Sequence, residues 1–109
     1  MQLTPIEGKT NLTADTASHD LALAERLAAA SQGDVAALFD LGVAYSTASD
    51  GAPSDLVEAH KWFNLAAARG HEEAGWSRAD ISEEMTAREI AEAQRRARQW
   101  LAEESVRAA

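Results

Sequence analysis

The sequence contains no cysteine, and this absence excludes disulfide bonds and thiolate metal sites. Proline is nearly absent, with only Pro5 and Pro53, and β-branched residues are few, whereas alanine is used heavily. This composition favours helix almost throughout the chain and predicts no strand. A length of 109 residues is that of one small domain with a single core.

The chain also lacks an excess of basic residues, since its formal net charge is -8. Residues 1–50 hold 7 acidic and 2 basic side chains, and residues 51–109 hold 11 and 8. Nucleic acids and anionic membranes bind basic faces, so we expect neither as a partner. The segment from Met1 to Asn11 shows no signal-peptide pattern, and no apolar run has the length of a membrane span. We therefore expect a cytoplasmic protein.

Residues 1–17 show no hydrophobic period that lasts more than a few positions, which predicts a flexible N-terminal arm. A helical domain follows over residues 18–109. Its first helix is expected from about Ser18 to Gln32, with Gly33 as the stop signal. The helical period places one set of residues on a common face: Leu21, Ala24, Leu27 or Ala28, and Ser31.

A second helix is expected over about 35–48, because Asp34 is a good N-cap and apolar residues recur at helical spacing. Gly42 lies in its middle, where glycine costs about 1 kcal/mol relative to alanine. We interpret this glycine as a site of close approach by another backbone. The segment from Ser49 to Pro53 has the chemistry of a turn, in which Gly51 takes a positive φ.

The third helix is expected to begin after Ser54 or Asp55 and to run to Arg69, with Gly70 following it. Its buried stripe is predicted to comprise Ala59, Trp62, Phe63 and Ala66. A shorter helix over about 72–82 contains Trp76 and Ile81.

The last helix begins with a capping box formed by Thr86 and Glu89, and is expected to end near Glu104. Glu92 and Arg96 are spaced for an ion pair. A single narrow apolar stripe follows this helix, and it comprises Ile90, Ala93 or Gln94, Ala97, and Trp100 or Leu101. One-sided packing of this kind is typical of a terminal capping helix.

The chain matches itself at an offset of 37 residues, the difference between Gly33 and Gly70. The same offset superimposes small residues at the expected helix crossings: Ala22 on Ala59, Ala29 on Ala66, Ala30 on Ala67, and Ala37 on Ala74. Such a period indicates a helical solenoid.

The residues of one repeat, about 34–70, resemble the Sel-1-like repeat, a relative of the tetratricopeptide repeat found in bacterial proteins. The matching positions are Ala37, Leu41-Gly42, Tyr45, Gly51, Asp55, Ala59, Trp62-Phe63, Ala66-Ala67, Gly70 and Ala74. The next copy departs from the pattern at Arg78-Ala79 and Ser82. Ala48 also replaces a loop glycine, and the loop is one residue longer than usual. The resemblance implies a short, right-handed, all-α solenoid of about five helices, with one full repeat, degenerate flanking repeats and a closing helix at about 86–104.

Catalytic chemistry finds little support in the sequence. The three histidines, His19, His60 and His71, fit no zinc-ligand spacing, and there is no glycine-rich phosphate loop. The pairs Glu83-Glu84 and Glu103-Glu104 are interpreted as solvated helix faces. We expect a protein that is not an enzyme and needs no cofactor or metal. A small hydrolase that uses His71 and nearby carboxylates is the remote alternative.

The resemblance implies that the first helix of each pair lines a groove that binds a protein or peptide. The predicted groove residues are Phe39, Asp40, Val43, Ser46, Trp76, Asp80 and Glu83. Apolar anchors with an acidic rim suit a partner segment that is basic and apolar. In the alternative interpretation, Trp76 packs beneath the last helix and Phe39 is internal. A homodimer, formed through the groove or through the helix at 20–32, is the alternative function.

Overall fold

The computed structural model describes residues 21–108, so the predicted arm at 1–17 and the predicted start of the first helix at Ser18 lie outside the described residues. Within that range the protein is all-α, with five helices and no strand. The first helix is described over 21–31. It is followed by α2 (Val35–Thr47), α3 (Leu56–Ala68), α4 (Glu72–Ser82) and α5 (Ala87–Ala108). The expected all-α, helical repeat-like fold is confirmed.

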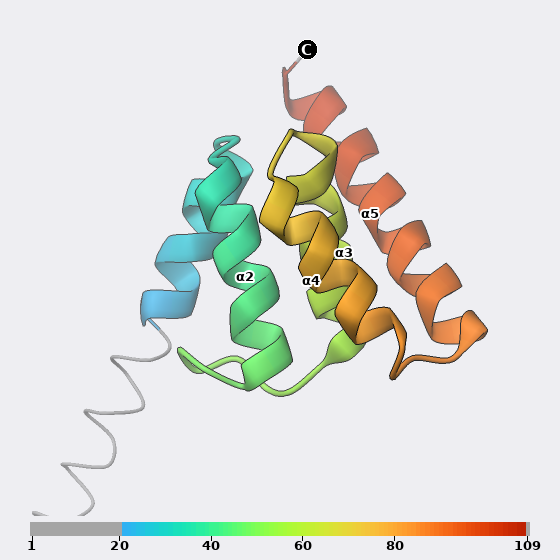
Figure 1. Cartoon of the computed structure of the whole chain (residues 1–109). Helices are drawn as coiled ribbons and strands as arrows, with labels where there is room; N and C mark the ends of the chain where they lie inside the picture. The colour runs from blue at the N-terminus through green and yellow to red at the C-terminus, as the bar shows by residue number, and fades with distance from the viewer. Residues whose placement is uncertain (1–20, 109) are drawn as a thin grey trace, which may run out of the picture.

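The helices form two layers (Figure 1). Helices α2 and α4 lie side by side at the front, and α3 lies behind them, with α5 on its far side. Helix α3 packs against α2, α4 and α5, so it occupies the centre of the molecule. The core gathers small and large apolar side chains from these helices: Ala30, Ala37, Leu38, Leu41, Ala59, Trp62, Phe63, Leu65, Ala66, Ala74 and Ala97.

Side-chain caps fix the starts of the helices as the sequence predicts. Asp34 accepts a hydrogen bond from the backbone N–H of Ala37 (3.2 Å), and Asp55, rather than Ser54, caps α3 by accepting from Glu58 (3.1 Å). The capping box is complete, because the Thr86 hydroxyl accepts from the Glu89 amide (3.1 Å) and the Glu89 carboxylate accepts from the Thr86 amide (2.8 Å).

The structure corrects two expectations, one about the face of the first helix and one about the end of α5. The face predicted for the first helix is wrong in part, since Leu21 is 59% exposed and Ala24 is exposed. Leu27 of that face does pack against the core, where Leu23 and Ala30 join it. This helix carries alanines on several of its sides, so the sequence does not define one face as the most apolar. Helix α5 runs to Ala108 instead of about Glu104, because no glycine or proline stops it.

Close approach at Gly42 is confirmed, but the neighbour is a side chain. A Cβ atom on Gly42 would lie 2.8 Å from Cγ of Phe63 and closer still to two other atoms of that ring. The predicted neighbour was another backbone. Gly42 therefore makes room for the aromatic ring that joins α3 to α2.

The last helix is attached to α3 by one narrow stripe, as expected. Ala93 and Ala97 are buried, and the ring of Trp100 meets that of Trp62 edge-on with centroids 4.9 Å apart. Of the paired choices, Ala93 and Trp100 lie on the packed side, whereas Gln94 and Leu101 are exposed.

Candidate functional site

The four groove residues predicted on α2 differ in their surroundings. Phe39 is packed against the core, where its ring stacks on that of His71 (4.3 Å between centroids) and is tilted toward Phe63 (5.6 Å). Val43 is half-buried against the same core. The Ser46 hydroxyl donates to the carbonyl of Val43 at 3.1 Å. Phe39 is therefore largely an internal residue that joins α2 to the start of α4.

Asp40 lies at the solvent edge of α2. Its carboxylate lies 3.9 Å from Nε of Arg26, and the same arginine lies 3.3 Å from the carboxylate of Asp50. This pairing ties α2 and the following loop to the first helix. At these exposures such pairs contribute about 0–1 kcal/mol each.

All three groove residues predicted on α4 are exposed. Trp76 is 68% exposed, and Asp80 and Glu83 are also exposed. The alternative in which Trp76 packs beneath the last helix is therefore wrong. The buried side of α4 is instead supplied by Ala74, with Ile81 partly buried against the core.

Two further acidic residues share the outer side of α4 with Trp76. Glu72 lies one turn before Trp76, and Glu73 is its neighbour on the same exposed side. We call Glu72, Glu73, Trp76, Asp80 and Glu83 the acidic face. In the part of the chain that the structure describes, none of its four carboxylates forms an ion pair. The prediction from groove positions missed Glu72 and Glu73, although their helical spacing from Trp76 was visible in the sequence.

The charge pattern of the acidic face is not the one that best stabilises a helix. Glu72 and Glu73 stand in the first turn, where the helix dipole favours negative charge. Asp80 and Glu83 stand at the other end, where each carboxylate costs about 0.3–1 kcal/mol by the same effect. Residues that weaken their own helix and remain exposed are typical of binding surfaces.

His71 has a structural role at the start of α4. Its Nδ1 atom accepts a hydrogen bond from the amide of Ala74 at 3.1 Å, so His71 is the N-cap, and its ring stacks on Phe39. Both interactions hold the imidazole in place, and the hydrogen bond occupies its Nδ1 atom. Among residues 21–108, no group of three or more metal-ligating side chains comes together.

A polar cluster between α3 and α5 centres on Glu58. Its carboxylate accepts from Trp62 Nε1 (3.2 Å) and Arg96 Nη1 (2.8 Å), and lies 3.1 Å from Lys61 Nζ. Burial of the carboxylate opposes its ionisation, but Lys61 and Arg96 outweigh that effect and lower the pKa of Glu58. Arg96 also makes the predicted pair with Glu92 at 2.8 Å. The Glu58 contact joins residues far apart in sequence, and no local pattern indicates it.

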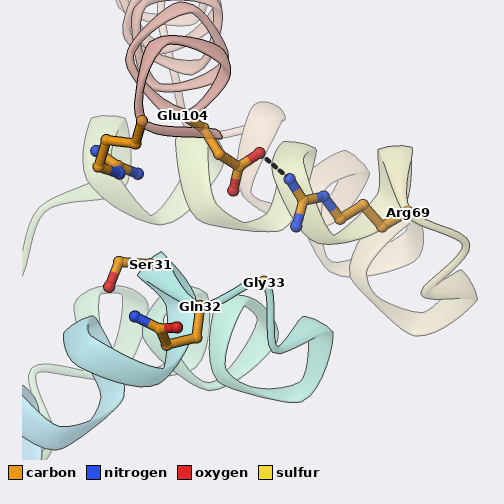
Figure 2. Close-up of a pocket in the computed structure, with 6 residues that line it drawn as sticks. Ser31, Gln32, Gly33, Arg69 and Glu104 are labelled. Carbon is orange, nitrogen blue, oxygen red and sulfur yellow. Dashed lines mark hydrogen bonds and ion pairs between the residues drawn. The ribbon is translucent and has the colours of Figure 1, made fainter. Parts of the chain in front are cut away.

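An open hollow of about 500 Å³ lies where the first helix, α3 and α5 end together. Figure 2 shows the carboxylate of Glu104 pointing to the guanidinium of Arg69, above Ser31 and Gln32. Glu104 is thus half-buried and ion-paired, which corrects its interpretation as part of a solvated face. None of the predicted groove residues lines this hollow. Because Arg69 and Glu104 are paired with each other, the hollow offers little attraction to an anionic or a cationic ligand.

No protein-family model matches the chain, and no curated protein matches it. As for membranes, none of the helices in residues 21–108 is both long enough and apolar enough to span a bilayer. The acidic face is therefore the candidate site on the strength of its own geometry and charge.

Proposed function

We propose that this protein is a non-catalytic interaction module of the Sel-1-like kind, which acts in the bacterial cytoplasm and binds a protein or peptide across α2 and α4. The single observation that carries the proposal is the acidic face. It places a tryptophan that is 68% exposed among four exposed carboxylates on one helix.

Tryptophan is enriched among the residues that supply most of the binding energy at protein interfaces. An indole exposed to water does not contribute to the packing of the core. Its burial under a partner would remove a large apolar surface from solvent. The surrounding carboxylates favour a partner of opposite charge and disfavour an acidic one. The partner proposed is therefore a basic segment with apolar side chains.

Helix α2 supplies the neighbouring part of the proposed surface. It lies beside α4 (Figure 1), and its residues Val43 and Ser46 are half-buried, while the side chain of Asp40 is 51% exposed. Phe39 supports this surface from within the fold, because its stacking on His71 fixes the start of α4 relative to α2. A helical or an extended segment could lie along this pair of helices.

The proposal is tested with a short, fluorescently labelled peptide that alternates lysine and leucine and is titrated with the protein at low salt. We expect Trp76→Ala to weaken binding at least tenfold, since loss of an interface tryptophan costs about 2 kcal/mol or more. Leu101→Ala is the matched control, because Leu101 is another exposed apolar residue but lies on α5. Equal binding by wild type and Trp76→Ala would overturn the proposal.

Thermal unfolding of the same variants separates binding from folding. Trp76→Ala is expected to change the free energy of unfolding by no more than about 0.5 kcal/mol, as is usual for surface substitutions. Phe39→Ala is expected to cost several times more, because it removes two aromatic contacts within the fold. A large loss of stability in Trp76→Ala would instead assign Trp76 to the fold.

A further inference from the structure

The outer side of α5 carries the opposite charge to the acidic face. Its residues recur at intervals of three, four and seven, so they lie on one side of the helix, and all are exposed: Arg88, Ala91, Arg95, Arg98 and Ala102. We call this set the arginine stripe. We propose that the acidic face of one molecule binds the arginine stripe of a second copy of this chain. This inference rests on the proposed function, because it names one partner for the same face.

Two of the three arginines in the stripe keep their positive charge available for a partner. Within residues 21–108, Arg88 and Arg98 form no ion pair. The nearest acid, Glu92, is bound by Arg95 (2.7 Å) and Arg96 (2.8 Å). These hydrogen bonds lower the pKa of Glu92 to about 2, so Glu92 stays ionised and is paired with Arg95 and Arg96. Arg88 and Arg98 therefore carry the charge that a partner can meet.

The two faces agree in length. Helix α4 rises about 16 Å between Glu72 and Glu83, and α5 rises about 15 Å between Arg88 and Arg98, at about 1.5 Å per residue. Each face carries charges toward both ends. Two helices laid against each other therefore bring carboxylates and guanidinium groups together along most of the contact.

The stripe also has room for the indole of Trp76. Ala91 lies between Arg88 and Arg95 and Ala102 follows Arg98, so small side chains stand beside the arginines. An arginine next to such a gap can stack on an aromatic ring. The molecule already uses such contacts internally. Arg107 lies 5.4 Å from the ring centre of Trp100, and Lys61 lies 4.0 Å from that of Trp62.

Pairing between two different faces gives head-to-tail association. Each added copy leaves one acidic face and one arginine stripe free, so the assembly grows with concentration unless it closes into a ring. Two acidic faces repel each other, and this disfavours a symmetric pair through α4. A contact of one helix on one helix is smaller than a standard interface, so the association is expected to be weak and sensitive to salt.

Sedimentation velocity on the full chain tests the inference with two charge-reversed variants. The first carries Asp80→Lys and Glu83→Lys, and the second carries Arg88→Glu and Arg98→Glu, while Arg95 is kept because it binds Glu92. From about 10 μM to about 1 mM, a range that covers weak complexes, the wild-type mass should rise with concentration and fall with added salt. Each variant alone should stay a monomer.

A mixture of the two variants is the decisive sample. The first keeps its arginine stripe and the second keeps its acidic face, so the two variants should associate with each other although neither associates alone. A wild type that remains a monomer over the whole range overturns the inference, as does self-association of either variant alone. Circular dichroism checks folding, and the neutral replacements Asp80→Asn, Glu83→Gln, Arg88→Gln and Arg98→Gln substitute for any variant that fails to fold.

The outcomes separate this inference from the proposed function. Binding of the lysine-leucine peptide without self-association overturns the inference and leaves the proposed function standing. Loss of both overturns both. Self-association that disappears in Trp76→Ala supports both together.

Discussion

Gly42 shows how a single missing side chain fixes the contact between two helices. The ring of Phe63 occupies the space where a Cβ atom would stand, and it is 2% exposed and contacts the ring of Phe39. The ring therefore has little freedom to move away. A glycine that weakens α2 as an isolated helix strengthens the fold, because it permits this packing.

We expect Gly42→Ala to lower the free energy of unfolding by about 1–2 kcal/mol. Overpacking costs about 1–3 kcal/mol, and the upper part of that range applies here because a Cβ would lie within 2.8 Å of three ring atoms of Phe63. This cost exceeds the gain of about 1 kcal/mol from replacing a mid-helix glycine. Gly75→Ala is the matched control, since a Cβ there would lie 3.9 Å from Cβ of Ala67, an ordinary contact, and should be neutral or stabilising. Urea unfolding of both variants measures the difference, and equal stabilities would contradict the packing argument.

At the scale of the helices, the ends are determined by residues close in sequence. Asp34, Asp55 and the pair Thr86 and Glu89 each satisfy backbone N–H groups of the first turn, and Gly33 and Gly70 take positive φ (90° and 94°) where helices end. These interactions span three or four residues. Within residues 21–108, helix ends were therefore predictable from the sequence to within about two residues, except at the end of α5.

Thr86→Ala is expected to cost about 1 kcal/mol, because the amide of Glu89 loses its acceptor at the start of α5. Thr86→Ser keeps the hydroxyl and should retain most of the stability. Chemical denaturation with circular dichroism provides the measurement. If the alanine and serine variants were equally stable, the capping box would not contribute to α5.

The face that each helix buries was harder to predict than its ends. In the first helix the alanines leave the apolar direction ambiguous, and the structure places Leu23, Leu27 and Ala30 in or against the core. For Trp76, the sequence alone left two positions open, on the surface or beneath α5. Only the three-dimensional arrangement shows that Ala74 fills the contact with the core and leaves Trp76 outside.

The candidate site was predicted in part for the same reason. Trp76, Asp80 and Glu83 follow from the repeat pattern, and helical spacing could have added Glu72 and Glu73. Phe39 was placed in the groove, but its stacking on His71 depends on how α2 meets the loop before α4. Contacts such as Glu58 with Arg96, or Arg69 with Glu104, join residues more than 30 positions apart and have no local signal.

For the whole molecule, the pH dependence of stability should be shaped by one buried histidine. His60 is 3% exposed, and its Nδ1 atom has no hydrogen-bond partner within the described residues. Burial, with the charge of Arg78 on α4, lowers the pKa of His60 below its ordinary value of 6.5. The folded protein therefore holds this imidazole neutral where the unfolded chain would protonate it.

The unfolded state binds more protons than the folded state between those two pKa values, so stability rises with pH across that window. The contribution is complete above about pH 6.5 and is lost as the pH falls toward the lowered pKa. We expect His60→Gln to reduce the change of unfolding free energy with pH in this window. Urea unfolding between about pH 8 and about pH 5, the range in which histidine titrates, measures it. Parallel profiles for wild type and variant would contradict this account.

The central position of α3 has a consequence for how the chain folds. Helices α2 and α4 flank α3 in sequence as well as in space, so most contacts among α2, α3, α4 and α5 join helices that are neighbours in the chain. Loops that close such contacts are short, and the entropy lost in closing them is small. Topologies of this low contact order fold in microseconds to milliseconds. The folding chain therefore spends little time with its aromatic side chains exposed to solvent, where they could cause aggregation.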